Sequence, residues 1–187
     1  MNRMNHIEII YQEDSKQKIV ENNIFDYISK KGVWVLFGCE SGKTYYECLN
    51  VGKSINVGSE ILYDVACLKL LNYNTDKKDG LLYINQFAEG KGFNYEPGKT
   101  QEFLYPYINS KYRKLVFIYV WNDNNEDIEK NLAWILHASF WRDKAPFRKL
   151  RENYYDNNKD EMLKTFKKYE NNVNLVVKEV KKILENS

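Results

Sequence analysis

An almost unbroken apolar run at residues 113–121, RKLVFIYVW, constrains the fold of this chain more than any other segment. Its β-branched and aromatic residues are typical of a strand. Its near-continuous apolarity is typical of a central strand that is buried on both faces. We therefore expect an α/β (α+β) fold, in which this strand joins a small mixed sheet flanked by helices.

A β-hairpin is predicted upstream of that strand. GVWVLFG at 32–38 and TYYECLNVG at 44–52 are rich in β-branched and aromatic residues, and the polar turn CESGK separates them. Ser59 then has the position of an N-cap, and apolar residues recur at helical spacing as far as Leu71. The hairpin is therefore expected to run into a helix that begins within about two residues of Ser59.

The rest of the chain is predicted to complete one domain over residues 1–187. We expect a strand at 6–11, a helix at 15–31, a loop at 72–80, a strand at 80–87, a surface excursion at 89–100 and an acid-started helix after 121. The divisions are an N-terminal strand and helix at 1–31, a core at 32–148, and a C-terminal helical extension at 149–187.

The last helix carries an apolar stripe with alternating spacings of four and three residues. This pattern is typical of an a/d heptad repeat, and it has two interpretations. The helix packs along its own domain, or it forms a homodimer through the 162–183 helix. The stripe consists of Met162, Phe166, Tyr169, Val173, Val176, Val180 and Ile183.

Composition excludes several kinds of site. The net charge of +2 is too small to direct the whole molecule to nucleic acid or to an anionic membrane, so such contacts would need a local patch. No signal-peptide core and no membrane-length apolar run is present, so we expect a cytoplasmic protein without membrane contact. Three cysteines without CxxC spacing and two histidines support neither a disulfide framework nor a histidine-rich metal site.

The turn between the two hairpin strands has a second interpretation. Residues 38–44, GCESGKT, are similar to a phosphate-binding P-loop, but the spacing is one residue short. A P-loop also has to open a helix whose amides hold the phosphates, whereas YYECLNV reads as a strand. We therefore interpret the segment as a hairpin turn.

The hairpin and its helix resemble the GIY-YIG nuclease core. GVW at 32–34 and NVGKSINVGSEI at 50–61 correspond to its two strand motifs and first helix, and IEKNLAWILHASFWRDKAPF at 128–147 is similar to its later helix. The resemblance covers roughly residues 32–148. It implies a strand–strand–helix–strand–helix order and a nuclease site with two tyrosines, an arginine and a glutamate that holds one divalent cation.

Most of the positions that the resemblance implies for catalysis have changed. The two tyrosines fall on Trp34 and Asn50, and the arginine falls on Glu60. Glu129 keeps the metal-binding position, although a glutamate in the first turn of a helix is also favoured by the helix dipole. The closing asparagine is replaced by a segment that contains Arg148.

Other residues could refill the site or bind nucleic acid. Tyr46 could replace a missing phenol, on the strand face that two-residue periodicity assigns to Cys48, Asn50 and Gly52. Lys53 could replace the lost arginine. A basic cluster interleaved with aromatic residues is typical of a nucleic-acid surface, and it consists of Arg142, Lys144, Arg148, Lys149 and Arg151.

The sequence therefore predicts a binding protein on a degenerate GIY-YIG nuclease-like core. The expected partner is DNA or a DNA-processing protein, in restriction, repair, mobile-element or phage defence and anti-defence conflict. No cofactor is expected in that case. The alternative is an active endonuclease with a rearranged site, for which the resemblance implies Mg²⁺ or Mn²⁺.

Overall fold

A computed structural model describes residues 5–11, 17–20, 24–70, 108, 111–141 and 159–186. In chain order these residues form β1 (Asn5–Tyr11), β2 (Gln17–Val20), the 3₁₀ helix η1 (Ile24–Tyr27), β3 (Gly32–Glu40), β4 (Glu47–Ser54), α1 (Val57–Leu70), β5 (Tyr112–Trp121), α4 (Glu126–Ile135) and α6 (Lys159–Glu185). The α+β class and the long C-terminal helix are confirmed. The loop, strand and surface excursion predicted at 72–80, 80–87 and 89–100 lie outside the described residues.

The five strands form one sheet in the order β2-β1-β5-β3-β4. Each described neighbour pair is antiparallel, so the sheet is not mixed in strand direction. β3 and β4 form the predicted hairpin, and their connection at residues 41–46 opens no helix, which rules out the P-loop geometry. β5 lies between β1 and β3, as predicted for a strand buried on both faces.

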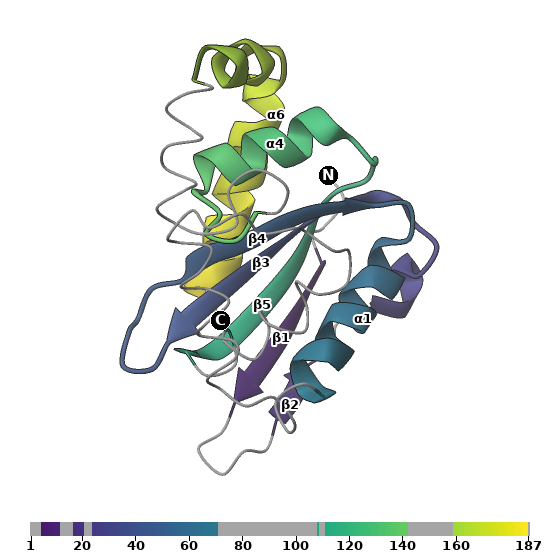
Figure 1. The fold of residues 1–187 in the computed structure, drawn as a ribbon, viewed down its shortest axis with the longest axis vertical. Helices are drawn as coiled ribbons and strands as arrows, with labels where there is room; N and C mark the ends of the chain where they lie inside the picture. Colours follow the sequence, from purple (N-terminus) through teal and green to yellow (C-terminus); the bar gives the residue numbers. More distant parts are fainter. Residues whose placement is uncertain are drawn as a thin grey trace, which may run out of the picture.

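Two apolar clusters cover the two faces of this sheet. Leu115 and Phe117 of β5 belong to the first cluster, under α1 and η1, and Val116 and Ile118 belong to the second, under α4 and α6. Figure 1 shows α1 on one side of the sheet and α4 with α6 on the other. Alternate residues of β5 point to opposite faces, and this explains why its sequence is apolar throughout.

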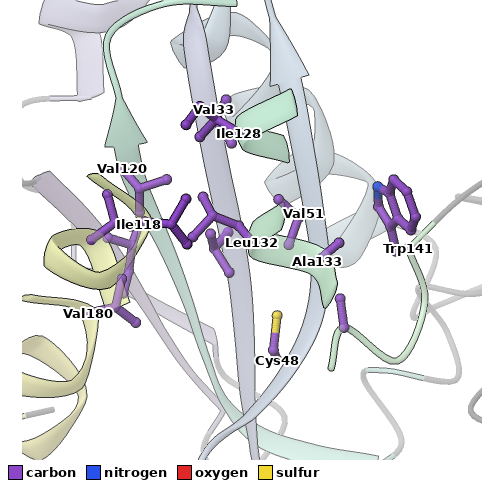
Figure 2. Close-up of a cluster of buried hydrophobic side chains, with 14 of the residues drawn as sticks. Val33, Cys48, Val51, Ile118, Val120, Ile128, Leu132, Ala133, Trp141 and Val180 are labelled. Carbon is purple, nitrogen blue, oxygen red and sulfur yellow. The ribbon is translucent and has the colours of Figure 1, made fainter. Parts of the chain in front are cut away.

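The second cluster contains the apolar stripe of α6. Val173, Val176 and Val180 are buried in it, and Figure 2 shows Val180 beside Ile118 and Val120 of β5. Phe166 also packs against the cluster, where its ring meets Trp134 edge-on with centroids 5.8 Å apart. The stripe therefore lies along its own domain, the first of its two interpretations.

The predicted helix at 15–31 is wrong. Residues 17–20 form β2, which pairs with β1 through Ile9 and Ile19, and among the described residues of this segment only Ile24–Tyr27 is helical, as a single 3₁₀ turn. This segment has few apolar residues, so its helical pattern was weak. Pairing with β1 instead provides hydrogen bonds for the backbone of residues 17–20.

The first turn of α1 corrects a second expectation. The helix begins at Val57, within two residues of Ser59, but Asn56 provides the first accepting carbonyl, since Glu60 N donates to Asn56 O at 3.0 Å. The Ser59 hydroxyl instead donates to the carbonyl of Ile28 at 3.0 Å. Ser59 therefore fastens α1 to the segment after η1 and is not the N-cap.

α4 ends in a Schellman motif with a histidine at the position that usually holds glycine. His137 has φ of 51°, its N–H donates to Trp134 O at 3.2 Å, and the N–H of Ala138 donates to Ala133 O at 3.0 Å. His137 is exposed and lies outside the core.

His137→Gly should stabilise the protein by about 0.5–1 kcal/mol, because glycine adopts positive φ without the Cβ clash. His137→Ala is the matched control, since it removes the imidazole and keeps the Cβ. Thermal unfolding of the three proteins should give the highest midpoint for the glycine variant. A glycine variant no more stable than the alanine variant would show that backbone conformation does not limit stability here.

No helix within the described part of the chain is both long and apolar enough to span a membrane.

Candidate functional site

Trp34 lies in the middle of the sheet and not at an open surface. On β3 it is opposite Gly52 of β4 and Tyr119 of β5, and its side chain is 3% exposed. A Cβ at position 52 would come within 2.4 Å of the Trp34 ring, so only glycine leaves space for the indole. Trp34 also stacks at a tilt on Phe117, with centroids 5.7 Å apart. It is a core residue of the first cluster.

Glu60 is the polar partner of this tryptophan. The indole Nε1 donates to Glu60 Oε1 at 3.1 Å. α1 brings Glu60 into reach because its start is fixed close to η1: Val57 N donates to Lys30 O at 2.8 Å, and a Cβ on Gly58 would lie 2.6 Å from the backbone of Ile28. Two residues at positions that the resemblance would assign to catalysis, Trp34 and Glu60, therefore bind each other.

Asn50 lies next to a β-bulge that the sequence pattern did not reveal. Leu36 is opposite Asn50 and Phe37 is opposite Cys48, so Leu49 is an extra residue on β4. The Asn50 side-chain oxygen accepts from the N–H of Val51 at 2.9 Å. The Asn50 side chain therefore binds the backbone of the next residue beside the bulge.

The bulge also overturns the expected shared face of Tyr46, Cys48, Asn50 and Gly52. Cys48 belongs to the second cluster and Tyr46 packs against that cluster, whereas Gly52 faces Trp34 in the first cluster. An inserted residue shifts the alternation by one, so residues before and after it change faces. Tyr46 consequently does not replace a phenol beside Trp34.

A different phenol does lie beside Trp34, and the sequence reasoning missed it. Tyr119 of β5 pairs with Trp34, stacks on Tyr27 with centroids 4.7 Å apart, and donates from its hydroxyl to the carbonyl of Lys31 at 3.3 Å. Burial, with a smaller contribution from Tyr27, raises the pKa of Tyr119 to about 12. Period-two alternation from Phe117 could have placed Tyr119 on this face. Only the strand order could show its neighbour.

Lys53 does not replace the missing arginine. It is opposite Val33, a member of the second cluster, and therefore on the face of the sheet away from Trp34. Its charge helps to lower the pKa of Glu126 at the start of α4, after the larger effect of the ion pair between Lys130 and Glu126 at 2.8 Å. Lys43, in the hairpin turn, pairs with Glu40 at 2.8 Å.

Glu129 lies on the same far face as Lys53. α4 begins at its N-cap Asn125, whose side chain accepts from Ile128 N at 3.1 Å, and the next residue, Glu129, points into the second cluster. Its carboxylate is buried and accepts from Trp141 Nε1 at 3.2 Å. Glu129 thus holds the segment that follows α4, where Phe140 N donates to Leu49 O of the bulge at 2.7 Å.

A divalent cation does not fit these residues. Mg²⁺ and Mn²⁺ prefer several oxygen ligands with room for bound water, whereas Glu129 is buried and its carboxylate accepts from the indole of Trp141. Among the described residues, no group of three histidine, cysteine or carboxylate side chains comes together as a ligand set. The sheet itself separates Glu129 from Trp34 and Glu60.

The predicted basic cluster lies outside the described residues. This holds for Arg142, Lys144, Arg148, Lys149 and Arg151, so their arrangement stays a prediction. Comparisons of the chain with protein-family models, with curated proteins and with solved structures found no match.

Proposed function

We propose that this chain is a binding protein on a degenerate GIY-YIG nuclease-like core, which acts on DNA or on a DNA-processing protein in restriction, mobile-element or phage defence and anti-defence conflict. A cytoplasmic location belongs to the same proposal. The element order β3, β4, α1, β5, α4 supports it, since this is the order that the resemblance of residues 32–148 implies.

The hydrogen bond from Trp34 to Glu60 carries the proposal that this core binds without cutting. In a nuclease of this type, these positions would act on the scissile phosphate. Here they bind each other at 3.1 Å, and Gly52 and Phe117 fill the remaining space around the indole. An indole has no ionisable oxygen, and a carboxylate next to a phosphate opposes the negative charge that develops in the transition state.

The alternative function, an active endonuclease with a rearranged site, has one observation in its favour. Tyr119 places a phenol next to Trp34, with Lys31 nearby. However, a pKa raised to about 12 keeps that phenol protonated at neutral pH, which makes it a poor base. Lys31 is engaged with Asp123 at 2.8 Å. We therefore favour the binding protein.

Homodimerisation through the 162–183 helix is not part of this proposal. A dimer formed by that stripe would compete with the packing of Val173, Val176 and Val180 in the second cluster.

The purified protein should bind duplex DNA and leave plasmid and phage DNA uncut in Mg²⁺ or Mn²⁺.

Glu129→Ala should lower the free energy of unfolding by about 1–3 kcal/mol, because it leaves the buried Trp141 N–H without this acceptor. Glu129→Gln, the matched control, keeps an acceptor oxygen and should lose less. Gel electrophoresis of DNA and urea unfolding measure the two effects.

The Glu129→Gln variant separates the two functions. A metal ligand depends on the carboxylate charge, whereas the hydrogen bond to Trp141 needs only an oxygen. Metal-dependent cleavage by the wild type that is lost in both Glu129 variants would establish the endonuclease and contradict the proposal.

A further inference from the structure

The outer face of α6 carries lysines at both ends and amides between them. Its inner face is buried through Val173, Val176 and Val180. With about 3.6 residues per turn, the residues halfway round the helix point to the other side. The exposed lysines, asparagines and leucine there are Lys164, Lys167, Lys168, Asn171, Asn174, Leu175, Lys178, Lys181 and Lys182, and the exposed acids Asp160 and Glu185 lie on the same side, beyond the two groups of lysines. We call this set the α6 outer face.

Four lysines of the α6 outer face have no ion-pair partner among the residues that the structure describes. Lys168 lies 3.8 Å from Asp127, and Lys182 lies 3.0 Å from Glu179. The remaining lysines of the set make no ion pair with any described residue; these are Lys164, Lys167, Lys178 and Lys181. Two acidic residues, Glu170 and Glu179, occur between Lys164 and Lys182, and Asp160, Glu161 and Glu185 flank that range, so the six lysines of the set outnumber the acids on their own side of the helix, Asp160 and Glu185. The face is therefore a local positive patch on a chain whose net charge is only +2.

We propose that the α6 outer face is a docking surface for B-form duplex DNA. This inference rests on the proposed function and names the surface that would perform it. Lys164–Lys168 and Lys178–Lys182 are two clusters whose centres are about 20 Å apart at a rise of about 1.5 Å per residue. A helix about 10–12 Å wide enters a major groove about 12 Å wide, and the clusters then meet the phosphates on its two sides.

The residues between the two clusters fit the floor of a major groove. Asn171 and Asn174 present amides, which can donate to and accept from an adenine edge, and Leu175 is 50% exposed and can contact a thymine methyl group. Neither the amides nor the leucine have a charge that would repel phosphate.

Two other polyanions fit this face less well. A helix that binds an anionic membrane inserts its apolar side into the lipid, but the apolar stripe of α6 is already buried against α4 and β5. Duplex RNA has a deep and narrow major groove that does not admit a helix. B-form DNA is therefore the partner that matches both the charge and the shape.

The test compares double variants that remove equal charge. Lys164→Gln with Lys167→Gln, and Lys178→Gln with Lys181→Gln, should each lower the slope of log affinity against log salt by about 2 and weaken binding about tenfold to a hundredfold at about 0.1 M salt. Lys30→Gln with Lys31→Gln, beside η1, is the control and should leave the slope unchanged. The probe is a mixed-sequence duplex DNA, measured by fluorescence anisotropy, with melting curves to verify folding.

The possible results distinguish a failure of the α6 surface from a failure of the proposed function. If the wild type binds DNA and both α6 double variants keep its slope, while neutralising Arg148, Lys149 and Arg151 lowers it, the α6 surface is wrong and the proposed function stands. If the wild type binds no DNA, the DNA-binding form of the proposed function and this inference fall together. Lysine-dependent binding of equal strength to duplex RNA or to phosphatidylserine vesicles would overturn the groove-docking geometry.

Discussion

Val173→Asp is expected to remove a large part of the free energy of unfolding. Val173 of α6 is fully buried in the second cluster, where it packs among apolar side chains from α4 and the sheet. An aspartate at this position would bury a carboxylate among apolar side chains. Burying an unpaired charge lowers the free energy of unfolding by about 4 kcal/mol or more. Native domains have only about 5–15 kcal/mol of stability. Far-ultraviolet circular dichroism during urea unfolding would measure the loss.

Leu175→Asp is the matched control for this variant. It adds the same charge to the same helix two residues away, but Leu175 is half exposed, so the expected change is within about 0.5 kcal/mol. The pair also tests the two interpretations of the stripe. If the stripe instead formed a homodimer, Val173→Asp would give a folded monomer, and the melting temperature of the wild type would rise with protein concentration.

Trp34→Ala should have the second largest effect, a loss of about 3–5 kcal/mol in the free energy of unfolding. The change empties the space between Gly52 and Phe117 and removes the donor to Glu60. Trp34→Phe keeps much of the packing and loses the N–H, so it should cost clearly less than the alanine variant. Chemical denaturation with a second probe besides tryptophan fluorescence is required, because the substitution removes a reporter.

The behaviour of Glu60 completes this test. Glu60→Gln retains an oxygen that can accept from the indole and should cost less than about 1 kcal/mol. The position is then structural, as its contacts indicate. A Trp34→Ala protein that kept its stability and lost DNA binding would instead place Trp34 in the binding surface.

Strong local patterns predicted several elements correctly. The β-branched and aromatic residues of β5 and of the two hairpin strands indicated strands, and the spacing of four and three residues in α6 indicated a helix with one buried side. The segment 15–31 had too few apolar residues for such a signal. Its strand was decided by pairing with β1, which lies outside any local window.

The candidate site was harder to predict because strand pairing, and not closeness in the sequence, decides which of its residues are neighbours. The alternation of β4 predicted a shared face for Tyr46 and Asn50, but one bulged residue, Leu49, changed the face between them. The pairing of Tyr119 with Trp34 depends on β5 lying next to β3, which no residue pattern specifies.

The sequence by itself determined what Trp34 and Glu60 can do chemically, because residue type alone fixes that an indole is no base and that a glutamate side chain is acidic. It also determined that β5 would be central. Only the tertiary structure decided that Trp34 and Glu60 bind each other on one face while Glu129 is buried on the other. The physical reason is that a sheet with helices on both faces assigns each side chain to a face through pairing, register and bulges, and these are long-range properties.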